Sequence, residues 1–299
     1  MKQREMSFLE WTNRFATQEA CLAEIARHRW PEGFMCPRCG HDRAYELNQR
    51  AIQQCAGCRY QVSVTAGTVF HHTHVPLPKW FAAIYLMSAD KGGISALRLS
   101  KLIGVSWPTA YRILRLLRRA MADRDRSYWL SGLIEVDDAL VGGRRPGKRG
   151  RGAEGRTPVL LAVENHGRCA GYLAAQALPT GLNQGAVRAF ARRHIGPEAA
   201  LRSDALGALR SLGEHHAHEA RVTPPDQATE WLPKVHLIIA NLKRFILGTF
   251  HGVSRKYLQD YVDEFVYRFN RRQWEPELPQ RLLEAAVAHV PIQGRLCKV

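Results

Sequence analysis

The sequence has no apolar run long enough to cross a membrane, and it opens without an apolar leader. Its longest apolar run, residues 80–87, is short, whereas a membrane-spanning helix needs about 20 residues. The first residues, Met-Lys-Gln-Arg-Glu-Met, do not resemble a secretory signal. We therefore expect a soluble cytoplasmic protein with no membrane partner, in which cysteines stay reduced.

Acidic residues are scarce relative to basic ones. The chain has 27 Asp and Glu against 43 Lys and Arg, which gives a net charge of +16 and a pI near 9.9. Such an excess favours a polyanionic partner through counterion release, although a basic enzyme without such a partner has the same composition. With 299 residues, 45% of them hydrophobic, the chain can hold a small module and one or two cored domains.

Four of the seven cysteines form two Cys-x-x-Cys pairs, Cys36 with Cys39 and Cys55 with Cys58. Two disulfides or a redox site of the thioredoxin type are the alternatives. A redox site needs only one such pair, and a reducing compartment disfavours structural disulfides. The spacing is typical of a tetrahedral structural zinc site, so we predict a zinc ribbon over residues 31–75.

A helical segment over residues 1–30 precedes the ribbon, and residues 76–125 follow it as a predicted helix-turn-helix region. Helices are expected over 94–103 and 107–119, joined by a turn at Gly104. The second helix carries arginines and no acid, and Arg112 and Arg115 are candidate DNA contacts. An ordinary helical hairpin with a solvated basic face is the alternative.

From residue 126 to 299 the pattern changes to an α/β domain. Apolar strands are expected over 133–143, 158–164, 170–175 and 199–204, with a helix over 183–194 before the last strand and another over 205–212 after it. This order is that of a ribonuclease-H-like sheet, which brings acids on adjacent strands together. Paired carboxylates suit phosphoryl transfer assisted by two magnesium ions.

A Gly-rich basic loop separates the first two strands. It is a candidate phosphate-binding segment, and a solvated linker is an equally good interpretation of the loop alone. The basic residues that we expect to contact DNA are Arg144, Arg145, Lys148 and Arg149.

Several motifs resemble the DDE-type insertion-sequence transposases with an N-terminal zinc ribbon, the ISXO-like group. They are Glu-Val-Asp-Asp-Ala-Leu-Val-Gly-Gly from residue 135, Arg-Ser-Asp-Ala from residue 202 and Glu-Phe-Val-Tyr-Arg-Phe-Asn-Arg-Arg from residue 264. The resemblance extends from about residue 8 to residue 272. It implies a ribonuclease-H-like domain that cuts and joins DNA at the ends of its own element with Mg²⁺ or Mn²⁺, while the zinc is structural.

The resemblance also implies which residues act. Asp137 and Asp204 match the first two catalytic acids and are the expected magnesium ligands. The third acid is missing, because His236 stands seven residues before the helix Lys243, where relatives carry Glu. Asn241 is the other candidate for the third position, since its carbonyl oxygen suits magnesium. A core histidine, a capping asparagine and an inactive site are the alternatives.

Lys243 and Arg244 are expected at the DNA backbone, and Arg268, Arg271 and Arg272 are expected to extend the basic surface. For Arg268, pairing with Glu264 one helical turn earlier is the strong alternative.

The resulting hypothesis is a transposase that binds the terminal inverted repeats and target DNA. It implies at least a homodimer on DNA in the bacterial cytoplasm, associated with the nucleoid. A catalytically inactive zinc-ribbon and helix-turn-helix regulator derived from a transposase is the competing hypothesis, and the missing third acid is its main support.

Overall fold

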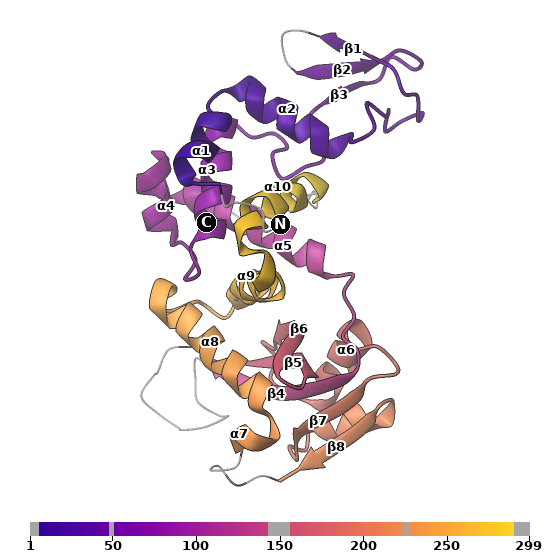
Figure 1. Ribbon diagram of the computed structural model, residues 1–299, viewed down its shortest axis with the longest axis vertical. Helices are drawn as coiled ribbons and strands as arrows, with labels where there is room; N and C mark the ends of the chain where they lie inside the picture. Colours follow the sequence, from indigo (N-terminus) through magenta and orange to yellow (C-terminus); the bar gives the residue numbers. More distant parts are fainter. Residues whose placement is uncertain (1–5, 48–50, 143–155, 223, 225–227, 290–299) are drawn as a thin grey trace. The chain divides into compact units, whose positions relative to one another are not determined.

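The structure is a computed structural model that describes residues 6–47, 51–142, 156–222, 224 and 228–289 (Figure 1). The chain divides into two compact units, and Asp125–Gln273 forms the second. The candidate DNA contacts of the basic loop, Arg144, Arg145, Lys148 and Arg149, lie outside the described residues. Among the described helices, none has both the length and the apolarity of a membrane span.

The first unit is mainly helical. The expected N-terminal helical segment is two helices, because the chain turns after Phe15 and Thr17 starts a new helix by accepting a hydrogen bond from Ala20 N at 3.2 Å. Trp11 packs against Phe15 and Phe81, and its indole N–H donates to the Phe81 carbonyl at 2.9 Å. The helices are α1 (Phe8–Arg14), α2 (Gln18–Arg29), α3 (Leu77–Ala89), α4 (Ala96–Ile103), α5 (Trp107–Asp125) and α10 (Leu278–Ala288).

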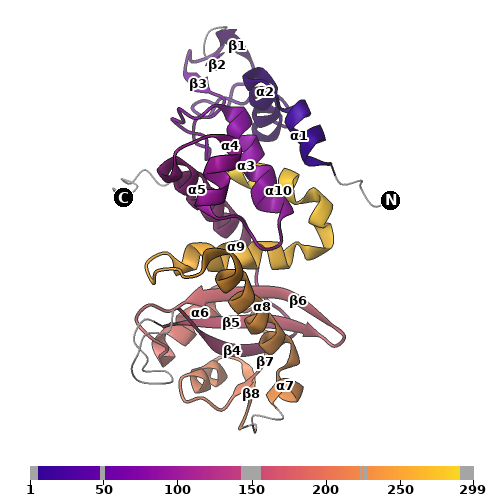
Figure 2. The same ribbon diagram turned by 90° about the vertical axis from the view of Figure 1, so that its left-hand side faces the viewer.

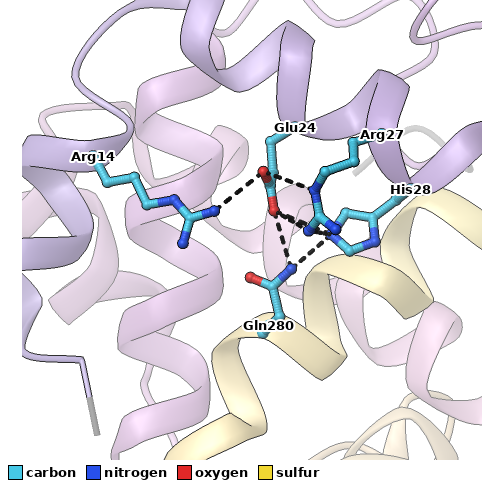
Figure 3. A network of polar contacts seen from close by, with 5 residues as sticks. All are labelled: Arg14, Glu24, Arg27, His28 and Gln280. Atoms are coloured by element: carbon cyan, nitrogen blue, oxygen red, sulfur yellow. Dashed lines mark hydrogen bonds and ion pairs between the residues drawn. The ribbon is translucent and has the colours of Figure 1, made fainter. Parts of the chain in front are cut away.

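Helix α10 belongs to this first unit, whereas the sequence placed residues 126–299 in one domain. Figure 2 shows α10 beside α3, and the Val69 amide donates to the Ala286 carbonyl at 3.0 Å. The Gln280 side chain donates to buried Glu24 of α2 at 3.1 Å (Figure 3). The C-terminal segment is therefore not a tail of the predicted catalytic domain, because its apolar face is buried against the N-terminal helices.

A small antiparallel sheet, in the order β1-β2-β3, adjoins the cysteine pairs: Cys36 and Cys39 precede β1, Cys55 ends β2 and Cys58 lies in the turn between β2 and β3. Its strands are β1 (Ala44–Leu47), β2 (Ile52–Cys55) and β3 (Gln61–Ser63). The short β3 alternates as a half-buried strand does, with Gln61 exposed and Val62 buried.

The second unit is a five-stranded mixed sheet in the order β6-β5-β4-β7-β8. Strands β4, β5 and β6 pair with one another in antiparallel fashion. Strand β7 then pairs in parallel with β4, and β8 pairs in parallel with β7. This is the mixed α/β architecture that the sequence indicates. The strands are β4 (Leu133–Val141), β5 (Thr157–His166), β6 (Cys169–Ala177), β7 (Ala200–Asp204) and β8 (Ala217–Arg221).

Helices cover both faces of this sheet, as Figure 1 shows for α6 (Gln184–His194) and α8 (Pro233–Phe250). Alternate residues of β4 face opposite sides, so Ile134 and Val136 pack in the core with α6, while Ala139 and Val141 pack in the core with α8. The remaining elements are η1 (Leu209–Glu214), α7 (Ala228–Trp231), α9 (Leu258–Asn270) and η2 (Arg272–Glu277). Residues 205–212, expected to form a helix, contain a 3₁₀ turn instead.

The outer edge of β6 is covered by α9. Gln259 accepts from the Ala177 amide at 2.7 Å, and Asn270 accepts from the Leu173 amide at 2.8 Å and donates to the Leu173 carbonyl at 3.0 Å. These amide side chains satisfy backbone groups that an open edge would leave unpaired. The Asn of the Phe-Asn-Arg-Arg motif therefore has a structural role.

Candidate active site and metal centre

The two acids that the sequence singles out lie at the same level of two adjacent strands. Strands β4 and β7 run parallel with Val136 opposite Ser203, and Asp137 and Asp204 are the next residue on each strand. Neighbouring strands are about 5 Å apart. Because Val136 faces the α6 side, the following residues face the α8 side. Two carboxylates separated by 66 residues of sequence thus lie on one face.

His236 reaches the first of these acids from helix α8. Its Nε2 lies 3.1 Å from Asp137 Oδ2, and both side chains are largely buried. The other oxygen of Asp137 accepts a hydrogen bond from the Asp138 amide at 2.7 Å, which fixes the carboxylate. Asp204 is fixed in a similar way, because its Oδ1 accepts from the Leu206 amide at 3.2 Å.

Glu135 holds the start of α8 in place, a role that no local sequence pattern indicates. The helix begins at Pro233 without a side-chain cap of its own. The fully buried Glu135 instead accepts from the amides of Lys234 at 2.8 Å and Val235 at 2.9 Å, and Asn165 donates to its other oxygen at 2.6 Å. A carboxylate is favourable at a helix N-terminus because of the unpaired amides and the helix dipole. This contact sets the first turn of α8 over β4, and His236 is the next residue.

The surroundings of His236 are strongly negative. The hydrogen bond with Asp137 raises the pKa of His236, burial opposes the rise, and the charges of Asp137, Glu135 and Asp204 raise it further. A cation at this face offsets the excess negative charge. The donor set fits a divalent metal, since carboxylate oxygens suit Mg²⁺ and Mn²⁺ and an imidazole nitrogen suits Mn²⁺ better than Mg²⁺.

Asn241 lies on a different side of helix α8 from His236. It lies five residues further along α8, which corresponds to about 140° around the helix axis. Lys243 is seven residues from His236, so it lies on nearly the same side of the helix, two turns away. Lys243 and Arg244 are both exposed. The geometry brings His236 to the acids, and it leaves Asn241 on a different side of α8.

Three arginines expected on a basic surface are tied to groups within the second unit. Arg268 pairs with buried Glu264 at 2.9 Å, as the alternative interpretation held. Arg271 pairs with Asp125 at 2.6 Å and lies 3.7 Å from the Tyr267 ring centre. Arg272 donates to the carbonyls of Ala170 and Phe269. The expectation was wrong for Arg271, which is buried just after α9, and for Arg268, whose side chain is only 11% exposed, because charges so far removed from water need a partner.

The predicted pair of helices at 94–119 is present as α4 and α5. Gly104 has φ +61°, and this left-handed conformation favours glycine at the turn. Ser106 accepts from the Thr109 amide at the start of α5. Arg112 is exposed and Arg115 is partly exposed, whereas Arg118 is buried. Trp107, also exposed, stacks on Tyr111 with 5.3 Å between ring centres.

The four cysteines of the ribbon converge on one point. Their sulfurs all lie within 4.8 Å of one another, with 3.6 Å between Cys36 and Cys58 and between Cys39 and Cys55. Tetrahedral zinc with Zn–S bonds of about 2.3 Å places its sulfurs about 3.8 Å apart, so the site fits zinc. Within the described residues this is the one group of three or more potential ligands that is so compact. Asp137, Asp204 and His236 are spread more widely.

Two family models match the sequence. An ISXO2-like transposase domain matches residues 129–270, and a transposase zinc-ribbon domain matches residues 16–61. The first range contains both acids and His236, and the second contains all four cysteines. Residues 129–270 therefore belong to the ISXO2-like transposase domains and residues 16–61 to the transposase zinc ribbons.

A relative found by sequence similarity is also a protein of a transposable element. A protein in transposable element ISH50 of Halobacterium salinarum is 30% identical over 170 residues, which are 50% of this chain and 56% of that relative. The chain thus matches just over half of that protein's length.

Solved structures are more distant. The Mos1 transposase paired-end complex with the left transposon end has 13% identity and a TM-score of 0.27, over 71% of this chain and 80% of that one. The Mos1 strand transfer complex has 14% identity and a TM-score of 0.26, over 72% and 79%. At these scores the likeness supports no argument about the site.

Proposed function

We propose that this transposase binds the terminal inverted repeats of its own element and catalyses metal-dependent cleavage and strand transfer of DNA. The proposal rests on the positions of three side chains: Asp137 and Asp204 lie on one face of the sheet, and His236 Nε2 lies 3.1 Å from Asp137 Oδ2. Three groups that can ligate a metal thus come from β4, β7 and α8. The domain that contains them matches a transposase family.

Asp137 and Asp204 would hold divalent metal, with His236 as the third group in place of Asn241. When bound, Mg²⁺ or Mn²⁺ lowers the pKa of water and stabilises charge on the oxygens of a phosphodiester. The protein positions the ligands, because Glu135 fixes the first turn of α8 and backbone amides fix both aspartates. Lys243, exposed two turns beyond His236, would bind the phosphate backbone, and Arg244 would add a second charge.

The helix-turn-helix formed by α4 and α5 would recognise the element ends. Its second helix begins at an exposed Trp107 and carries exposed Arg112 about one and a half turns later, which suits a helix lying in the major groove. The zinc ribbon would add a rigid DNA-binding module at the N-terminus. Because two ends of one element are joined, the active species would be at least a homodimer on DNA.

The test is cleavage of labelled duplexes made from the DNA that borders this gene. We expect the full-length protein to nick one border duplex at its end only with Mg²⁺ or Mn²⁺. Asp204→Asn should abolish nicking and leave the gel shift in EDTA unchanged, because the exchange removes a metal ligand and keeps the shape. Glu198→Gln is the matched control, since Glu198 is exposed in the turn before β7. Binding without any cleavage by the unaltered protein would instead support the inactive regulator.

A further inference from the structure

Two arginines from adjacent strands share one aromatic ring beside Asp204. The guanidinium carbons of Arg202 on β7 and Arg221 on β8 lie 4.9 and 5.6 Å from the ring centre of Trp231. The indole N–H donates to the Ser203 carbonyl at 3.0 Å, which fixes the ring against β7. We call Arg202, Arg221 and Trp231 the Arg-Trp-Arg cluster.

The cluster lies on the same sheet face as the two acids. Arg221 is the register partner of Asp204 across the parallel β7 and β8 pair, and Arg202 precedes Asp204 by two residues. Side chains two residues apart on a strand point to the same side, as do partners in register. Trp231 ends α7, five residues before His236. The cluster therefore flanks the candidate site on the Asp204 side.

Its electrostatics favour an anion. Two guanidinium groups that contact one ring repel each other, and partial exposure lets a ligand reach them. The Arg202 side chain is 37% exposed and forms an ion pair with Glu219, whose carboxylate lies 3.4 Å from the Arg202 Nε. Arg221 is exposed on the edge strand. Guanidinium groups held against an aromatic ring lose little further freedom when they bind a phosphate in a bidentate manner.

We propose that the Arg-Trp-Arg cluster binds the phosphodiester backbone of the DNA strand that enters the candidate site. This inference rests on the proposed function and adds a binding subsite to it. Two carboxylates repel a polyanion, so cations next to Asp204 offset that repulsion and hold the strand in register. The cluster contacts the backbone alone, so it contributes affinity equally for every base sequence.

The test compares Arg221→Gln with the unaltered full-length protein on the labelled border duplex. The exchange keeps a polar side chain with hydrogen-bond donors and removes one charge. We expect the Kd to rise about threefold or more, and the slope of log K against log salt to fall by about one. Arg192→Gln is the matched control, because Arg192 is an exposed arginine on α6, over the opposite sheet face. It should leave the slope unchanged.

A second variant examines the ring. Trp231→Leu removes the aromatic ring and keeps both arginines, and we expect it to raise the Kd for the duplex as well. Hydrogen exchange of the β7 amides then shows whether the variant keeps its fold. If the unaltered protein cleaves the duplex while Arg221→Gln keeps its Kd and salt slope, the cluster only covers the sheet and this inference is wrong. If the unaltered protein neither binds nor cleaves, the proposed function fails first.

Discussion

Replacing Glu135 by Gln should loosen the first turn of α8 and displace His236. The carboxylate accepts from the Lys234 and Val235 amides at 2.8 and 2.9 Å and from Asn165 at 2.6 Å, with no exposure to solvent. A hydrogen bond to a charged group contributes about 1.5–3 kcal/mol, against about 0.5–1.5 kcal/mol for a neutral one. Each backbone bond should therefore lose about 1 kcal/mol when the charge is removed.

The two bonds together make local opening of this turn easier by about 2 kcal/mol. That is about a thirtyfold rise in the opening constant, since about 1.4 kcal/mol corresponds to tenfold. Gln also presents an NH₂ group either to Asn165 or to the helix amides, where only an acceptor fits. The effect should stay local, because the rest of α8 is held by its own apolar face.

The assay is hydrogen exchange of the full-length protein, followed by mass spectrometry of peptides from α8. Glu135→Gln should lose protection at residues 234 and 235, and its metal-dependent cleavage should slow while DNA binding in EDTA stays unchanged. Glu198→Gln, which removes an exposed carboxylate from the same unit, should do neither. Equal protection in Glu135→Gln and the unaltered protein would refute the proposed role of Glu135.

Three further predictions concern stability. Burial alone would raise the pKa of Glu24, but hydrogen bonds from Arg27 and Gln280 outweigh it and lower the pKa to about 2. The stability that Glu24 contributes is present above pH 4.5 and lost as pH falls towards 2, so Glu24→Gln should reduce the loss of unfolding free energy over this pH range by about 3 kcal/mol, measured by denaturant titration at each pH. Burial raises the pKa of Asp263 to about 7, so stability falls as pH rises from about 4 through 7, and Asp263→Asn should melt higher than the unaltered protein at pH 8 but not at pH 4. Cys58→Ser should abolish binding of one zinc per chain in a zinc-release assay and remove exchange protection of β1–β3; retained zinc would refute the four-cysteine site.

Short sequence patterns predicted the ribbon, two strands of the larger sheet and the turn between α4 and α5. The spacing of the cysteine pairs indicated the ribbon, and apolar runs followed by acids indicated β4 and β7. Gly104 marked the turn between α4 and α5, because a left-handed residue there favours glycine. Each of these signals lies within a few residues, where chain geometry alone links sequence to structure.

What the sequence did not reveal depends on contacts between distant segments. Strand β8 is largely exposed and polar, without the alternation of a half-buried strand, and pairing with β7 defines it. Glu135 contacts amides 99 and 100 residues away. The burial of α10 on the N-terminal helices likewise has no local sign. The sequence shows that His236 stands where relatives carry Glu. Only the fold brings that residue to Asp137 and leaves Asn241 on another side of α8.

The most direct test of the central claim compares His236→Ala with Asn241→Ala in cleavage of the labelled border duplex with Mn²⁺. We propose that His236 completes the site with Asp137 and Asp204. We therefore expect a loss of roughly a hundredfold in rate for His236→Ala and little change for Asn241→Ala, with both variants binding DNA normally in EDTA. Cleavage that survives in His236→Ala and is lost in Asn241→Ala would contradict it.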